Sequence, residues 1–203
     1  MSHPIEYVQV GSKSEMLAAI EKEKEGLTYI GSGSYASVYG LAELDFVIKH
    51  GNTCDSCIDR GYLAYLKAIQ EYGTEYYEQD NWGEEYPWNR GFKENPFLPR
   101  FFMAKIFKMG NEPIGYLVRM ERLIGVKDVQ SKSRFLKEIA ELREYILTPG
   151  KDSKEFHNPD ALNHLRRILA FALEVRNNGN DFDLHKYNWM MRGNQLVLID
   201  PVS

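Results

Sequence analysis

The sequence lacks most of the features that mark exported, membrane-spanning or nucleic-acid-coating proteins. Its two cysteines, among 203 residues, are too few for a disulfide-stapled scaffold. It contains no apolar run of about 18 residues, and residues 1–6 lack the basic and then apolar regions of a signal peptide. Its net charge of -4 is opposite in sign to that of proteins that coat phosphate backbones. We therefore expect a cytoplasmic protein without a membrane segment, for which nucleic acid is not the default partner.

The composition that remains is that of an ordinary globular protein. Hydrophobic residues make up 43% and charged residues 27%, and the length suffices for one substantial core or two small lobes. Runs of β-forming residues bounded by glycines and turns indicate strands. These runs occupy residues 29–30, 37–39, 46–48, 101–107 and 114–120. They predict an antiparallel sheet of about five strands in the first part of the chain.

Helical periodicity flanks and follows these strands. Ser12 and Glu15 have the spacing of a capping box and predict a helix to about residue 25. Apolar residues at helical spacing predict three more helices. These cover residues 58–72, residues 135–146, and a segment that starts at Asn158 and Pro159 and stops at Asn178 and Gly179. The β-rich part therefore forms a predicted small lobe over residues 1–123, and the helical part a large lobe over residues 124–203.

One segment interrupts the predicted small lobe. Residues 71–94 mix acids with many aromatic residues, and we interpret about residues 73–97 as an insertion. Aromatic side chains exposed among acids would form a docking surface for a basic partner. Alternatively, they would fold back on the small lobe as a satellite cluster. The sequence leaves both interpretations open.

Residues 30–39 read Ile-Gly-Ser-Gly-Ser-Tyr-Ala-Ser-Val-Tyr, the pattern of a phosphate-covering glycine loop. Glycines let backbone amides approach phosphate oxygens with no side chain between them. A dinucleotide-binding loop would require a helix directly after the glycines, whereas residues 37–39 look like a strand. The strand-loop-strand context favours a kinase-type loop. The expected nucleotide-binding residues here are Gly31, Ser32, Gly33, Ser34 and Val38.

Further along the chain, a lysine and three polar residues extend the pattern. Lys49 ends the predicted strand Val-Ile-Lys, a place where an ammonium group neutralises phosphate charge. Asp183, Asn188 and Asp200 follow, five and then twelve residues apart. A predicted apolar strand at residues 196–199 leads into the last acid. In kinases with such intervals the first acid orients the acceptor hydroxyl, while the asparagine and the later acid hold magnesium.

Together, the glycine loop, the Val-Ile-Lys strand, the segment Phe-Asp-Leu-His-Lys-Tyr-Asn and the terminal Ile-Asp-Pro-Val-Ser resemble the early serine/threonine kinases of autographivirus phages, the host-shutoff kinases. The resemblance spans about residues 30–203. It implies an α+β protein with a minimal bilobal protein-kinase-like fold, in which an antiparallel five-stranded small lobe precedes a truncated helical large lobe. It also implies transfer of phosphate from ATP, with Mg2+, to serine or threonine of bacterial host proteins during phage takeover.

The resemblance assigns roles to the motif residues. Asp183 would accept the proton of the acceptor hydroxyl, and Lys49 would position the phosphates. Asn188 and Asp200 would hold Mg2+ and contact ATP through it. Glu121, where the β-rich part ends, joins the expected ATP-binding residues.

Three positions depart from the usual kinase pattern. His185 stands where eukaryotic protein kinases usually have lysine, and Asp181 stands where they have the histidine of H-R-D. No helix glutamate has decisive spacing to pair with Lys49, because Asp59 and Glu71 lie at opposite ends of the predicted helix. We therefore expect an atypical kinase in which Lys49 has an unusual partner.

The end of the chain and the site leave other functions open. Because the sequence stops soon after Asp200, we expect no activation segment and few of the lower helices that usually bind peptide substrate. A truncated large lobe would expose apolar surface, which leaves a homodimer open. One alternative is a nucleotide-binding, pseudokinase-like protein that inhibits a host target by binding. Another is a small-molecule phosphotransferase, which His185 permits, and transfer of a nucleotide instead of a phosphate is also chemically open.

Cys54 and Cys57 form a C-x-x-C pair with three interpretations. With His50 they would supply part of a zinc site, but no fourth ligand is visible. At the start of the predicted helix they would form a redox switch beside the nucleotide site, because a helix N-terminus lowers a thiol pKa. The simplest interpretation, two small residues in a loop, is favoured.

Overall fold

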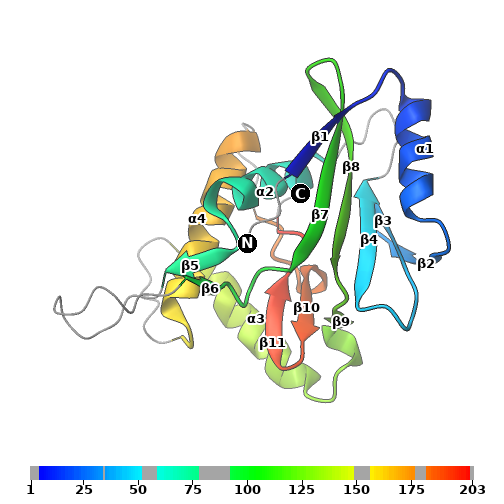
Figure 1. Cartoon of the computed structure of the whole chain (residues 1–203). Helices are drawn as coiled ribbons and strands as arrows, with labels where there is room; N and C mark the ends of the chain where they lie inside the picture. The colour runs from blue at the N-terminus through cyan, green and yellow to red at the C-terminus, as the bar shows by residue number, and fades with distance from the viewer. Residues whose placement is uncertain are drawn as a thin grey trace.

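The computed structural model of the chain describes residues 5–33, 35–51, 59–77, 92–148, 156–176 and 182–201. Within these ranges, four α-helices and a mostly antiparallel sheet form the predicted α+β architecture (Figure 1). No helix among the described residues is long and apolar enough to cross a membrane. Ser34, Cys54, Cys57 and Asp181 lie outside the described residues, as does most of the predicted insertion.

A six-stranded sheet dominates the first part of the chain, with the strand order β1-β7-β8-β4-β3-β2. Its strands are β1 (Ile5–Gln9), β2 (Thr28–Ser32), β3 (Ala36–Gly40), β4 (Phe46–Gly51), β7 (Phe101–Met109) and β8 (Glu112–Glu121). The five predicted strands are confirmed and pair antiparallel. The prediction omitted β1, which pairs in parallel with β7 at the sheet edge. Only Ile5 of β1 is buried, so this strand has no alternating apolar pattern to reveal it.

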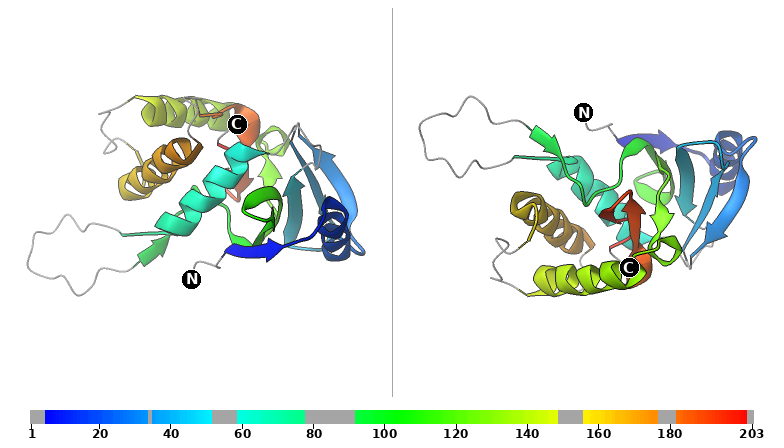
Figure 2. Two further views of the ribbon diagram at one scale, coloured as in Figure 1. Left: turned by 90° about the horizontal axis from the view of Figure 1, so that it is seen from above. Right: turned by 90° about the horizontal axis from the view of Figure 1, so that it is seen from below.

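Different helices cover the two faces of the sheet (Figure 2). The helix α1 (Lys13–Glu23) lies on one face, and α2 (Arg60–Tyr72) lies on the other. Successive side chains of a strand point to opposite faces. Ile48 of β4 therefore packs in the cluster under α1 with Met16 and Leu117, while Lys49 reaches the α2 face and contacts Tyr62. The register of β4 thus decides where the strand lysine projects.

The start of α1 follows the predicted signal, and a glycine ends α2. Ser12 caps α1, because its Oγ accepts a hydrogen bond from the amide of Glu15 at 3.2 Å. The Glu15 carboxylate accepts from the amide of Gly11 at 2.7 Å, one residue before the cap, so the capping box is closed one position early. Gly73, with φ of 75°, ends α2.

The remaining elements form the second part of the chain and a small hairpin. The helices α3 (Lys132–Leu147) and α4 (Pro159–Arg176) confirm two predictions. A three-stranded sheet has the order β11-β10-β9. It consists of β9 (Ile124–Gly125), β10 (Trp189–Arg192) and β11 (Gln195–Leu198). The short 3-10 helix η2 (Val126–Asp128) follows β9, and the 3-10 helix η3 (Lys186–Asn188) precedes β10. Only β11 corresponds to a predicted strand. The hairpin of β5 (Glu75–Tyr77) and β6 (Phe92–Glu94) lies within the predicted insertion, near its two ends.

One hydrophobic cluster connects the two predicted lobes. It includes Val118 of β8, Leu66 of α2, Leu169 of α4 and Leu198 of β11. In addition, the Tyr65 hydroxyl of α2 donates to the carbonyl of Leu198 at 3.1 Å. The division near residue 123 stays a prediction. The shared core holds the C-terminal segment against the sheet and so fixes the geometry of the site described next.

Candidate active site

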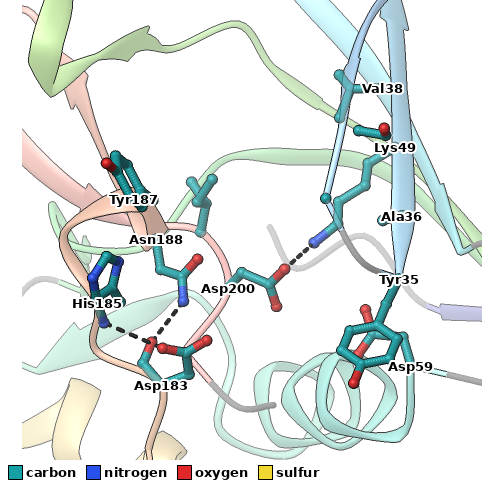
Figure 3. Close-up of a pocket in the computed structure, with 13 residues that line it drawn as sticks. Tyr35, Ala36, Val38, Lys49, Asp59, Asp183, His185, Tyr187, Asn188 and Asp200 are labelled. Carbon is teal, nitrogen blue, oxygen red and sulfur yellow. Dashed lines mark hydrogen bonds and ion pairs between the residues drawn. The ribbon is translucent and has the colours of Figure 1, made fainter.

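A pocket of about 540 Å³ lies between the glycine-loop side of the sheet and the C-terminal segment (Figure 3). Its walls come from the β2–β3 connection, from β4 and α2, and from residues 183–200. Most of the predicted site residues line it: Ser32, Gly33, Val38, Lys49, Asp183, Asn188 and Asp200. The structure therefore brings together residues that are far apart in the sequence.

The two glycines of the loop face open space. A Cβ atom on Gly31 or Gly33 would meet no other atom within 4 Å, and neither glycine has a positive φ. Neither packing nor backbone conformation therefore requires glycine at these positions. The two glycines instead keep space free in the pockets that they line, because a side chain at either position would occupy space that a ligand would use.

Lys49 and Asp200 form an ion pair across the pocket. The Lys49 Nζ lies 2.8 Å from the Asp200 Oδ2, and Lys49 is 7% exposed (Figure 3). The same Nζ lies 3.5 Å from the ring centroid of Tyr62, which is fully buried. A cation held against an aromatic face and a carboxylate is restricted in position. Lys49 therefore presents its charge at the pocket from a defined place.

Neither of the two acids considered on α2 is the partner of Lys49 in this arrangement. Asp59 is buried and caps α2, because its Oδ1 accepts from the Tyr62 amide at 2.9 Å. Its Oδ2 accepts from the Tyr116 hydroxyl at 2.9 Å. Glu71 lies in the last turn of α2 and is exposed. The helix thus offers Lys49 an aromatic ring where kinases commonly offer a carboxylate.

Backbone hydrogen bonds assemble Asp183, Asn188 and Asp200 into one corner of the pocket. The Asn188 Nδ2 donates to the Asp183 carbonyl at 2.7 Å, and the Asp183 amide donates to the Pro201 carbonyl at 2.8 Å. The Ile199 amide donates to the Asn188 carbonyl at 2.8 Å. The Nδ2 of Asn188 is thus turned toward Asp183, and its amide oxygen lies on the pocket side (Figure 3). This oxygen and the Asp200 carboxylate are oxygen ligands of the kind that Mg2+ prefers.

The charges in this corner favour a bound cation. Burial raises the pKa of the Asp200 carboxyl above its ordinary value, and repulsion from Asp59 and Asp183 adds to the increase, while Lys49 opposes it. No group of three or more His, Cys, Asp or Glu side chains among the described residues is arranged to hold a metal ion alone. Mg2+ commonly takes one or two protein ligands and completes its shell with water and substrate phosphates. The donors present fit that mode of binding.

A second, apolar pocket of about 240 Å³ adjoins the first, and Ser32, Val38, Lys49 and Ile199 line both. Its other walls include Ile30, Gly31, Val47, Met120, Leu123 and Met190, so apolar side chains approach it from the sheet and from β10. Ligand pockets with an apolar interior and a few polar groups at one end are typical of small-molecule sites. The two pockets together offer an apolar compartment that leads into a charged one.

Glu121 lines the apolar pocket, but its carboxylate is already engaged. The Arg192 Nε donates to Glu121 Oε2 at 2.8 Å, a second Arg192 nitrogen contacts Oε1, and the Arg100 amide donates to Oε1 at 2.8 Å. Glu121 is buried, and its partner comes from β10. Its side chain therefore joins the end of β8 to the C-terminal segment.

Sequence reasoning missed several residues of the site. Tyr62 was read only as one of the apolar residues of α2, and Met120, Leu123 and Met190 were not considered as pocket walls. Alternation along β4 and β8 would have placed Val47 and Met120 on the same face as Lys49. No comparable signal marks Met190, because β10 was not predicted.

His50 is the third residue in the zinc interpretation of Cys54 and Cys57. His50 is buried, its Nδ1 lies 3.0 Å from the Gly51 carbonyl oxygen, and its ring stacks on Tyr39 at 5.6 Å between centroids. Because Cys54 and Cys57 lie outside the described residues, the three interpretations of the pair stay predictions.

Comparisons with known proteins do not identify a family. A scan against protein-family models gives no match, and a search of curated proteins gives none either. The resemblance to phage kinases therefore stays a prediction that rests on the motifs.

Proposed function

We propose that the chain is an ATP- and Mg2+-dependent serine/threonine protein kinase with a minimal bilobal kinase-like fold, similar to the host-shutoff kinases of autographivirus phages. The observation that supports this most strongly is the meeting of Lys49 with Asp183, Asn188 and Asp200 at one pocket. These residues come from β4 and from a segment more than a hundred positions later in the sequence. Side chains that line one pocket in the structure are stronger evidence for a common chemical role than their spacing in the sequence alone.

The two adjoining pockets match the two ends of ATP. The adenine ring, which is planar and apolar on its faces, would enter the apolar pocket between Val38, Met120 and Met190. The triphosphate would then extend into the charged pocket beneath Gly33 and toward Lys49. This placement uses the open space in front of the glycines.

In the proposed reaction the acceptor hydroxyl attacks the γ-phosphorus of ATP. A bond forms between the hydroxyl oxygen and phosphorus, the bond from phosphorus to the β,γ-bridging oxygen breaks, and ADP leaves. Asp183 accepts the hydroxyl proton, and Lys49 neutralises charge on the phosphates. Asn188 and Asp200 would hold Mg2+, which when bound would supply positive charge to offset that of the phosphates. Positioning and electrostatic stabilisation would supply most of the acceleration.

The first test is transfer of label from γ-labelled ATP by wild type and by Asp183→Ala. The variant should lose transfer while it still binds ATP, because Asp183 acts on the acceptor and not on the nucleotide. Glu43→Gln, which changes an exposed acid outside the site, is the matched control and should keep full transfer. Undiminished labelling by Asp183→Ala would contradict the assignment.

A binding-only function is the second candidate, because α2 presents Tyr62 to Lys49 in place of a carboxylate. Such a pseudokinase-like protein would bind ATP and inhibit a bacterial host protein without transferring phosphate. Incubation with Mg2+ and labelled ATP, with and without host lysate, separates the two candidates. ATP binding with no labelled protein in either sample would favour binding over catalysis. Label from α-labelled ATP would instead indicate nucleotide transfer.

A further inference from the structure

A third pocket, of about 420 Å³, lies beside the candidate active site. We call it the basic groove, and its rim carries three lysines, Lys127, Lys132 and Lys186. Its floor is mainly apolar: Val126, Leu136, Trp189 and Met190. Tyr187 also lines it, and this tyrosine lines the charged pocket as well. The basic groove and the site of proposed phosphate transfer are therefore neighbours that share a wall.

The rim lysines have no carboxylate partner within salt-bridge distance among the described residues. All three are exposed. The Lys186 Nζ lies 5.1 Å from the ring centroid of Tyr187. Of the residues that the structure describes, three lysines and no acid line the basic groove, whereas the whole chain has a net charge of -4. A ligand of opposite charge would be attracted to this face specifically.

The covalent connection between the basic groove and the catalytic residues is short. Lys186 and Tyr187 belong to η3, and both lie between Asp183 and Asn188 in the sequence. Tyr187 is 69% exposed, so it offers an aromatic surface at the border of the two pockets. A chain that lies in the basic groove would therefore present its next residues to Asp183.

We propose that the basic groove binds an acidic segment of the protein acceptor and thereby selects serines or threonines that have Asp or Glu a few residues away. The proposal rests on the proposed kinase function, whose substrate class it narrows. Carboxylates of the acceptor would meet the lysine rim, and an apolar side chain between them would rest on the floor formed by Leu136 and Trp189. An extended peptide advances about 3.3 Å per residue, so a few residues suffice to pass from one pocket to its neighbour.

The experiment compares two peptides, one with a serine flanked on both sides by aspartates and one in which asparagines replace the aspartates. Wild type should phosphorylate the acidic peptide with the higher kcat/KM, and added salt should reduce the difference. The double variant Lys127→Glu with Lys132→Glu should reduce kcat/KM for the acidic peptide by about tenfold, the effect expected when two exposed charge pairs become repulsions. It should leave the KM for ATP unchanged.

The matched control is Lys22→Glu with Lys67→Glu, which makes the same change in net charge at exposed lysines of α1 and α2. This control should keep the preference for the acidic peptide. Equal kcat/KM for both peptides in wild type, or an equal loss in the control, would overturn the proposal.

Direct binding of the fluorescent acidic peptide, followed by anisotropy, separates this proposal from the proposed function. Binding that is weakened by the double variant but not by the control, in the absence of any phosphate transfer, would support the basic groove and contradict the kinase. Phosphate transfer without selective binding of the acidic peptide would support the kinase and overturn the proposal for the basic groove.

Discussion

The two faces of the six-stranded sheet are built for different purposes, although they share the same strands. On the α1 face, Ile48, Met16 and Leu117 are buried among other apolar side chains. On the α2 face, one position further along β4, Lys49 is buried against a carboxylate and an aromatic ring. Both faces contribute hydrophobic stabilisation, because Val118 and Leu66 are buried on the α2 side. The α2 face also holds the Lys49–Asp200 pair, whose charges cost free energy to bury. Natural proteins accept such a cost mainly where a function requires it.

The sharpest way to test this comparison is to change neighbouring residues of β4. Lys49→Met should lower phosphate transfer about a hundredfold or more, because it removes a positive charge aimed at the reacting phosphates. Ile48→Ala should instead lower the free energy of unfolding by about 2–5 kcal/mol and keep kcat per folded molecule. Urea denaturation and transfer of labelled phosphate measure the two effects. A loss of kcat in fully folded Ile48→Ala would show that the two faces are not separable.

A second test concerns the ring of Tyr62 beneath Lys49. Tyr62→Leu should reduce transfer about tenfold, because Lys49 loses the aromatic face that restricts its position, a contact typically worth about 1–2 kcal/mol. Tyr62→Phe keeps the ring and is the matched control. The Tyr62 hydroxyl is buried and has no hydrogen-bond partner among the described residues, so Tyr62→Phe should keep activity and leave stability equal or slightly higher. Equal activities of the two variants would contradict a role for the ring.

A third test uses the pH dependence of stability. Burial and neighbouring acids raise the pKa of Asp200, so in an acidic window the folded chain holds a proton that the unfolded chain has already released. The unfolding free energy should therefore fall as pH rises through this window. Asp200→Asn removes this contribution, so its stability relative to wild type should increase with pH. Urea denaturation at several pH values measures the difference, and the opposite trend would show that the attraction of Lys49 dominates.

The smallest expected effect is at the start of α1. Ser12→Ala removes the side chain that accepts from the Glu15 amide, so the free energy of unfolding should fall by about 1 kcal/mol. Transfer activity should not change, because α1 lies on the face opposite Lys49. Thermal unfolding and the transfer assay check both statements, and an activity loss would connect α1 to the site.

The sequence predicted those parts of the fold that have a local pattern. Five strands and four helices followed from alternation, periodicity and signals such as Ser12 and Pro159. The strand β1 was not predicted because most of its residues are exposed and it lacks an alternating apolar pattern. Its pairing with β7 also joins segments that are far apart in the chain. The short strand β9 pairs with β10 across the same kind of distance. Long-range pairing has no local signature.

The site was predictable to a similar extent. Motif spacing identified Lys49, Asp183, Asn188 and Asp200, and the structure brings all four to one pocket. Spacing could not show that Lys49 would contact Tyr62, because the partner of a buried charge depends on packing between elements. The basic groove likewise combines residues of η2, α3 and η3, none of which forms a motif by itself.

The central claim is that Asp183, together with Lys49, Asn188 and Asp200, transfers phosphate to serine or threonine of host proteins. Phosphoproteomics of bacteria that express wild type or Asp183→Asn tests this claim most directly. We predict that new phosphoserine and phosphothreonine sites appear with wild type, that acidic residues surround them, and that they are absent with the variant. The same set of phosphorylated sites in both cultures would contradict the account.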